Sequence, residues 1–205
     1  DGKTGEITLK GSFANASREL MLDLLMNEGP AGLAATRMQL PGAPSLTLAV
    51  HGAGVIDTFK ADVALATDNR RRLAGTVQLT TTPVEGQAVA QRGFHAELDG
   101  DVAPLFRPEY QRFFGPRARL VATGQALADG GFTLSELTIA AQAATLSGHA
   151  EVDADGVPTR ADLSLALGLP DKSDILLPTT GGDIFLRSAK LRFSLDAARG
   201  DNWLL

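Results

Sequence analysis

The sequence contains no cysteine and few aromatic residues, and both features exclude classes of function. Without cysteine among its 205 residues, the chain has no thiol nucleophile, thiolate metal site or disulfide. Aromatic residues make up 5% of the chain, which is too few for the stacking platforms that bind single-stranded nucleic acid. The net charge of −5 has the opposite sign to that of a nucleic-acid-binding surface. We therefore expect no nucleic-acid partner.

Long apolar runs are also missing. No stretch of about 18 apolar residues is present, so no membrane-spanning helix is predicted. The first residues, Asp1 to Gly5, have no signal-peptide pattern and are typical of a segment leading into a strand. We expect an internal piece of a longer protein, with any targeting segment outside it.

The feature that dominates the sequence is alternation. Between Leu46 and Leu195, short stretches that alternate apolar with polar residues end repeatedly at Gly, Asp or Pro. Phe132–Ile139 and Ala161–Leu167 are clear examples. A period of two places successive side chains on opposite faces of a strand. The sequence therefore predicts a mostly β fold, with one long sheet that has one apolar face.

The alternation also predicts which residues form that face. They share one parity along each expected strand, and together they are the candidate binding surface. The set is Leu46, Leu48, Val50, Phe59, Val63, Leu65, Val77, Leu79, Leu134, Leu146, Leu163, Leu165, Leu191 and Phe193.

Two helices are predicted to interrupt the strands. The first covers residues 17–27, where Leu20, Met21, Leu24 and Leu25 form a stripe at helical spacing. The second covers residues 107–114 and has Pro108 in its first turn. Each is followed by a Gly-Pro pair that stops a helix.

An internal repeat is the basis of our prediction for domain organisation. Residues 9–14 resemble residues 98–103 at an offset of 89, and each segment precedes a predicted helix. We interpret the chain as one continuous β-rich domain with two repeats, residues 1–92 and 93–205. In the alternative interpretation, two unrelated helices interrupt one sheet.

Catalytic signatures are absent from the sequence. It has neither a G-x-S-x-G nor a phosphate-binding G-x-x-x-x-G-K-[ST] motif. His51, His95 and His149 are far apart and are interpreted as ordinary strand residues rather than metal ligands. The Asp-Gly segments at 99–101 and 153–156 are interpreted as turns rather than calcium loops. We expect no enzymatic activity, cofactor or metal.

One basic run, Arg70–Arg72, has two interpretations. It is either a solvated turn between strands or a contact for anionic lipid headgroups or an acidic partner.

Several segments resemble the TamB family, the inner-membrane component of the bacterial translocation and assembly module. They are residues 18–33, residues 59–65 with 73–77, residues 101–115, and residues 146–156. These are patterns of Leu, Gly and Asp-Gly that AsmA-like relatives share. The resemblance covers most of the chain.

The resemblance implies a fold, a location and a set of partners. Proteins of this family cross the periplasm of Gram-negative bacteria as a long, curved, taco-like (U-shaped) β-sheet trough with an apolar interior. They serve phospholipid transport between membranes and outer-membrane protein assembly with TamA, an outer-membrane barrel. The expected ligands are phospholipid acyl chains or nascent outer-membrane protein strands. The chain is expected to be an internal segment, without the N-terminal anchor or the C-terminal partner-binding part.

Two other classes of function compete with this one. The first is a structural β-solenoid or adhesin-like module with a filled core. The second is a carbohydrate-active β-sandwich enzyme, which the scarcity of aromatic residues disfavours. For an open sheet we also expect edge strands that self-associate between chains.

Overall fold

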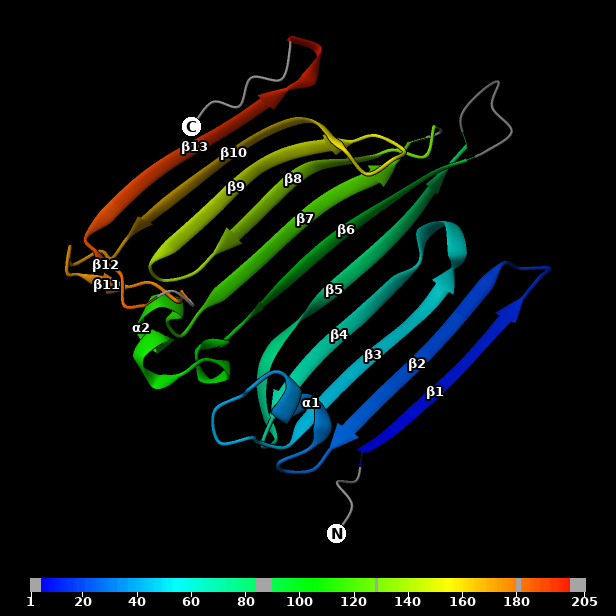
Figure 1. Ribbon diagram of the computed structural model, residues 1–205. Coiled ribbons are helices and arrows are strands. Elements are labelled where there is room, and N and C mark those ends of the chain that lie inside the picture. Colours follow the sequence, from blue (N-terminus) through cyan, green and yellow to red (C-terminus); the bar gives the residue numbers. More distant parts are fainter. Residues whose placement is uncertain (1–4, 84–89, 128, 180–181, 200–205) are drawn as a thin grey trace.

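The computed structural model describes residues 5–83, 90–127, 129–179 and 182–199. Eleven strands form one antiparallel sheet in which neighbours in space are neighbours along the chain, with β13 following β10 (Figure 1). The strands are β1 Gly5–Ala14, β2 Glu19–Glu28, β3 Leu46–Val55, β4 Lys60–Thr67, β5 Arg70–Thr82, β6 Gln91–Gly100, β7 Ala118–Ala126, β8 Phe132–Ala140, β9 Ala144–Val152, β10 Pro158–Gly168 and β13 Ser188–Asp196. The prediction of a mostly β chain with two short helices is confirmed.

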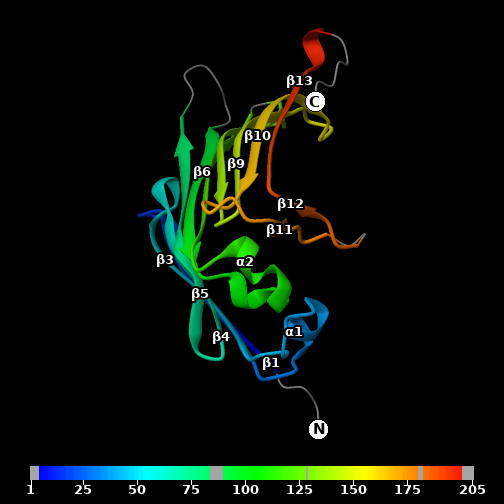
Figure 2. The same cartoon turned by 90° about the vertical axis from the view of Figure 1, so that its left-hand side faces the viewer.

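The sheet is not closed, because β1 and β13 lie at its two ends. Smaller elements accompany it on one side. These are α1 (Leu33–Arg37), α2 (Gln111–Phe114), and a hairpin of β11 (Ile175–Leu176) and β12 (Phe185–Leu186). Figure 2 shows all three on the same side of the sheet and near the same end of the strands. Short 3-10 turns complete the structure at Ile56–Thr58 (η1), Ala103–Leu105 (η2), Pro108–Tyr110 (η3) and Ala197–Arg199 (η4).

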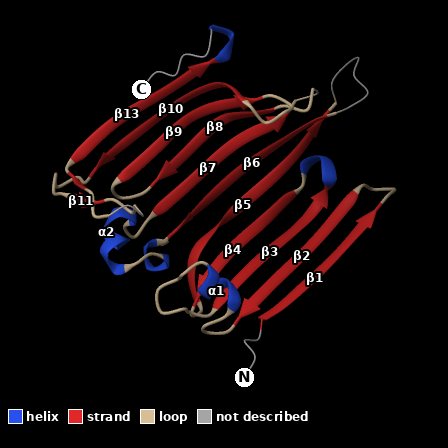
Figure 3. Cartoon of the chain, in the orientation of Figure 1, coloured by secondary structure: helices blue, strands red, loops and turns tan. Residues whose placement is uncertain are grey.

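The predicted helix at residues 17–27 is wrong, because this segment is strand β2 (Figure 3). Its sequence satisfies two periods at once. Leu20, Leu24 and Leu25 fit a helical stripe, but Leu20, Leu22, Leu24 and Met26 also fit a strand with one apolar face. Pairing with β1 on one side and β3 on the other selects the strand. The first helix, α1, instead follows the Gly29-Pro30 pair that was expected to end one.

The second predicted helix is present in a shorter form. Residues 108–114 form the 3-10 turn η3 followed by the single turn α2. Gly115, with φ of 67°, ends it in a conformation that favours glycine. The predicted turn at 153–156 is confirmed: the Asp153 side chain accepts hydrogen bonds from the backbone of Asp155 and Val157, at 3.0 and 2.9 Å.

The basic run Arg70–Arg72 is not a turn but the start of β5. The turn lies just before it, at Asp68 and Asn69, whose φ angles are 48° and 59°. Asp and Asn tolerate this left-handed conformation better than most residues. The Arg72 guanidinium donates a hydrogen bond of 2.7 Å to Thr67 Oγ1.

The two-repeat interpretation relied on a helix at residues 17–27, and this segment is a strand. Residues 9–14 lie in β1 and lead into β2, whereas residues 98–103 end β6 and lead towards α2. The two segments therefore occupy different places in the fold. The division into residues 1–92 and 93–205 remains a prediction.

Candidate functional site

The register of the sheet gathers apolar side chains on one face. Residues directly opposite each other in antiparallel strands project to the same face. Following these pairs from β1 to β13 gives one row that crosses all eleven strands. The row consists of Leu9, Leu24, Val50, Val63, Gly75, Leu98, Leu120, Ile139, Leu146, Leu165 and Leu191. No member of this row is polar.

A second row runs beside it on the same face, two residues along each strand. It consists of Gly11, Leu22, Gly52, Ala61, Val77, Ala96, Ala122, Leu137, Gly148, Leu163 and Phe193. We call the face that carries these two rows the apolar face.

The residues predicted as the candidate surface lie together here. Thirteen of them belong to paired strands and project to the apolar face: Leu46, Leu48, Val50, Val63, Leu65, Val77, Leu79, Leu134, Leu146, Leu163, Leu165, Leu191 and Phe193. Phe59 precedes β4 and is 4% exposed. A side-chain atom added at Gly52 would lie 2.4 Å from the Phe59 ring, so the ring covers that glycine. Lipid binding by these residues remains a prediction.

The predicted candidate surface leaves out several parts of the apolar face, among them Leu98, Leu120 and Ile139 of β6, β7 and β8. The β1 residues Ile7, Leu9 and Phe13 were left out, although they alternate like the rest. The apolar β2 residues were assigned to a helix. The same parity signal identifies both groups once residues 19–28 are placed in a strand.

No second layer covers the middle of the apolar face in the described part of the chain. Ile7, Leu79 and Ile139, on β1, β5 and β8, are 69%, 45% and 43% exposed. Soluble proteins rarely expose a contiguous apolar surface that crosses a whole sheet, and such surfaces mark binding sites.

One end of the apolar face is covered by two small caps. The first is α1 with the loop that follows it: Ala35, Leu40 and Leu46 are buried together, and Met26 and Leu65 of the sheet pack against them. The second consists of α2 and the β11–β12 hairpin. There Phe113 and Leu186 pack against buried Ala143, Leu169 and Ile175.

A buried carboxylate fastens the first cap. Glu28 ends β2 at a position of apolar parity, opposite Leu46, and is 9% exposed. Its carboxylate oxygens accept hydrogen bonds from the backbone N–H of Ala34 at 2.8 and 2.9 Å and of Ala35 at 3.2 Å. These N–H groups begin α1 and have no partner within the helix. Glu28 is therefore a structural residue.

The opposite face is polar and carries ion pairs between neighbouring strands. Arg192 on β13 donates a hydrogen bond of 2.6 Å to Asp162 on β10. This contact lowers the pKa of Asp162. His51 on β3 pairs with Asp23 on β2, and that hydrogen bond raises the pKa of His51. These groups are exposed and make the face opposite the apolar face hydrophilic.

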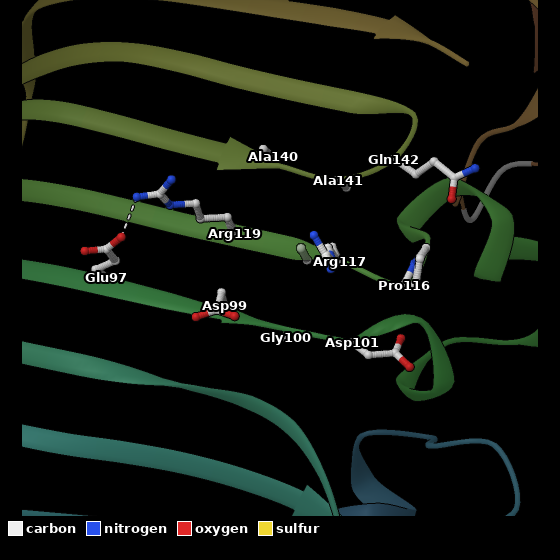
Figure 4. A pocket seen from close by; sticks show the side chains of 11 residues that line it. Glu97, Asp99, Gly100, Asp101, Pro116, Arg117, Arg119, Ala140, Ala141 and Gln142 are labelled. Carbon is white, nitrogen blue, oxygen red and sulfur yellow. Dashed lines mark hydrogen bonds and ion pairs between the residues drawn. The ribbon is translucent and has the colours of Figure 1, made fainter. Parts of the chain in front are cut away.

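A shallow polar pocket lies at the ends of β6, β7 and β8 (Figure 4). Glu97 and Arg119, which form an ion pair, both line it. Arg117 and Asp101 are further along its lining. One oxygen of Asp101 is buried without a hydrogen-bond partner, and the other is 3.9 Å from the Arg72 guanidinium. The lining contains no serine, cysteine or histidine.

Neither a cluster of metal-ligating side chains nor a membrane-spanning helix is present among the described residues. No group of three or more His, Asp or Glu side chains is placed to hold a metal ion there. None of the helices in the same residues has the length and apolar character needed to cross a membrane.

Comparisons of the chain with protein-family models, with curated proteins and with solved structures give no match.

Proposed function

We propose that this chain is a periplasmic segment of a TamB-like protein, and that its apolar face carries phospholipid acyl chains between the inner and outer membranes. The observation that supports this is the row of apolar side chains that crosses all eleven strands without a polar member. With neighbouring strands about 4.8 Å apart, the row is roughly 48 Å long. In the proposal the sheet curves into an open trough with this face inside.

The size and character of the face suit weak binding of acyl chains. Burying a methylene group contributes about 0.8 kcal/mol. An acyl chain of about 16 carbons that buries one side on the face therefore gains about 6 kcal/mol before its loss of conformational freedom. Leucine, alanine and valine side chains contain no polar group to hold the chain at one place. This suits movement along the face better than tight binding at a single position.

The proposed location and partners rest on the resemblance to TamB. It implies the periplasm of a Gram-negative bacterium and a TamA-like outer-membrane barrel as a partner of the longer protein. We assign no residue of this chain to contact with that barrel. Nascent outer-membrane protein strands are the other cargo that the resemblance implies, and they would bind by backbone pairing at an edge of the sheet rather than on the apolar face.

The geometry favours this proposal over the two rival classes. A solenoid or adhesin-like module needs a closed interior filled with side chains, whereas the described strands form one unclosed sheet. Ile7, Leu79 and Ile139 all remain exposed. A β-sandwich enzyme needs a second sheet packed on the first. The only other sheet among the described residues is the two-stranded β11–β12 hairpin.

The test compares carboxylates on the two faces of the same strands. The variant Val63→Glu/Leu120→Glu/Leu165→Glu places three charges on the apolar face. The control Ala64→Glu/Val121→Glu/Ala166→Glu places them at the next residues, on the polar face. The purified proteins are incubated with phospholipid vesicles and re-isolated, and the bound phospholipid is measured by mass spectrometry.

We expect the first variant to lose at least nine-tenths of the bound phospholipid, because charged groups oppose acyl burial, and the control to retain it. Circular dichroism establishes that both keep the β fold. Equal phospholipid in the two folded variants, or none bound by the unaltered chain, would contradict the proposal.

A further inference from the structure

The first cap covers apolar side chains that continue the exposed part of the apolar face. Met26 of β2 and Leu65 of β4 pack against the buried Ala35 and Leu40 of the cap. In the register of the sheet both lie beside Leu48 of β3, next to the apolar row that crosses all eleven strands. The side chains of the cap therefore occupy a place that has the same apolar surroundings as the open surface.

The second cap is fixed to the sheet by its backbone. The N–H groups of Gln142 and Ala143, in the turn between β8 and β9, donate hydrogen bonds of 3.0 Å to the carbonyl oxygens of Phe114 and Phe113. Arg112 of α2 donates hydrogen bonds of 2.8 and 2.6 Å to two side chains of the loop that follows β10. These contacts resist separation of α2 from the strands.

The first cap is held in a different way. Its backbone hydrogen bonds join residues of the cap to one another: Ala31 donates to the Ala43 carbonyl at 2.7 Å, and Leu40 donates to the Ala35 carbonyl at 2.9 Å. The sheet holds the cap by the Glu28 carboxylate and by apolar side-chain contacts. Both kinds of contact can be lost without breaking a strand pair.

The backbone of the first cap is also strained. Ala31, just before α1, and Gln39 and Ala43, after it, have φ angles of 56°, 54° and 41°. In this left-handed conformation the Cβ atom crowds the backbone, and glycine alone avoids the penalty. Strained residues of this kind are often found where a segment changes its conformation. Release of the cap from the sheet lets these residues return to ordinary conformations, so the strain favours release.

A cavity of about 690 Å³ lies beside the first cap. Met38 and Leu40 of the cap line one side of it, and Leu105, Phe106 and Tyr110 of the turns η2 and η3 line another. Met38 is 61% exposed. The first cap therefore has room to move without displacing the second.

We propose that the first cap is a displaceable lid, and that the apolar surface beneath it, which includes Met26 and Leu65, is a further binding site for a phospholipid acyl chain. When the lid is closed, Ala35 and Leu40 occupy this site. When it is open, the acyl chain takes their place. Glu28 holds the closed state, because its carboxylate joins β2 to the start of α1. This inference rests on the proposed function, which supplies the acyl chain.

The test uses vesicles of a phospholipid that carries a photoreactive diazirine at the end of one acyl chain. The chain is incubated with the vesicles, irradiated and digested, and the cross-linked peptides are identified by mass spectrometry. Cross-links at Met26 and Leu65 report on the site beneath the lid. Cross-links at Ile139 and Leu191, which are 43% and 52% exposed, report on the open part of the apolar face.

Two variants should shift the lid in opposite directions. Glu28→Ala removes the carboxylate that holds α1 and should raise cross-linking at Met26 and Leu65 roughly tenfold. Ala31→Gly/Ala43→Gly relieves the strain of the closed lid and should lower it by about the same factor. The matched control, Lys172→Gly, makes the same change at a φ of 57° in the loop before β11, and should leave the yield unchanged.

Cross-linking at Ile139 and Leu191 should stay within about twofold in every variant, and circular dichroism establishes that each keeps the β fold. Cross-links that remain confined to the open part of the face, or that change equally at both places, would overturn the lid and leave the proposed function standing. An unaltered chain without cross-links at either place would overturn both. The double glycine variant removes strain, so a failure to fold cannot account for its lower yield at Met26 and Leu65.

Discussion

Replacing Glu28 with alanine is expected to loosen the α1 cap and destabilise the protein by about 3 kcal/mol. The Glu28 carboxylate is the acceptor for the N–H groups of Ala34 and Ala35 at the start of α1. A hydrogen bond to a charged group contributes about 1.5–3 kcal/mol, and removal of a buried acceptor leaves its donors unsatisfied. The helix is too short to persist without this support. Ala35 and Leu40, which α1 and its loop hold against the sheet, should then become accessible to solvent.

Urea unfolding followed by circular dichroism measures the effect. With a slope of about 3 kcal/mol per molar urea, the unfolding midpoint of Glu28→Ala should fall by about 1 M. Backbone amide exchange at Ala34 and Ala35 should accelerate at the same time. Glu28→Gln, which keeps one acceptor oxygen, should show an intermediate loss. Gly32→Ala should resemble Glu28→Ala, since a methyl group there would lie 2.0 Å from the Glu28 side chain.

Glu19→Ala is the matched control for Glu28→Ala. It removes a glutamate from the other end of β2, where the side chain is exposed and accepts a hydrogen bond from the Ser17 hydroxyl. Its midpoint should change by no more than about 0.2 M. If Glu28→Ala matched this control, or if amide exchange at Ala34 and Ala35 stayed slow, the assignment of Glu28 as the anchor of α1 would be refuted.

Two further predictions concern the sheet itself. The pKa of His51 should lie above its ordinary value of 6.5, because Asp23 holds the protonated ring by a hydrogen bond and by its charge. This contribution to stability is fully present below pH 6.5 and is lost as the pH rises through the pKa of the folded state. An NMR titration of the ring should give a lower midpoint in Asp23→Asn, and an unchanged midpoint would contradict the pairing. Gly75→Ala should cost more than about 2 kcal/mol, because its methyl group would lie 1.9 Å from the Glu97 carbonyl oxygen. Gly11→Ala, where the nearest atom is 3.5 Å away, serves as the tolerated control in the same urea assay.

The apolar face was predictable because alternation is a local signal. Leu163 and Leu165, for example, share a face as soon as residues 161–167 form a strand, whatever the neighbouring strand is. The pairs that each residue makes across the sheet were not predictable in the same way. Bulges near Leu65, Gly124 and Leu134 shift the register, and nothing in the alternation marks them.

The prediction of the first helix was wrong for a related reason. Residues 19–28 satisfy a helical and a strand period equally, so only the neighbours decide between them. The sequence analysis also assigned no role to Glu28, because the predicted helix was expected to end at the Gly-Pro pair just after it. Glu28 ends a strand at a position that faces the apolar side, and it accepts a hydrogen bond from the N–H group six residues later. No pattern in the sequence alone marks this arrangement.

The elements that build the caps recur at nearly regular intervals along the sheet. The helix α1, the helix α2 and the β11–β12 hairpin follow β2, β6 and β10, which end at Glu28, Gly100 and Gly168, at intervals of 72 and 68 residues. Because strands alternate in direction, every second connection lies at this end of the sheet. The connections after β4 and β8 lie at the same end but are tight turns. Four strand spacings provide about 19 Å, whereas a helix with its side chains is about 10 Å wide. Additional elements at every second connection of this end therefore have room for both a helix and its loop. Additional elements at every connection would have about half that width and would collide. At the opposite end of the strands Phe59, Ala161 and Leu195 are buried. The exposed part of the apolar face in the described chain therefore lies between the two ends, where Leu9, Ile139 and Leu191 are 65%, 43% and 52% exposed.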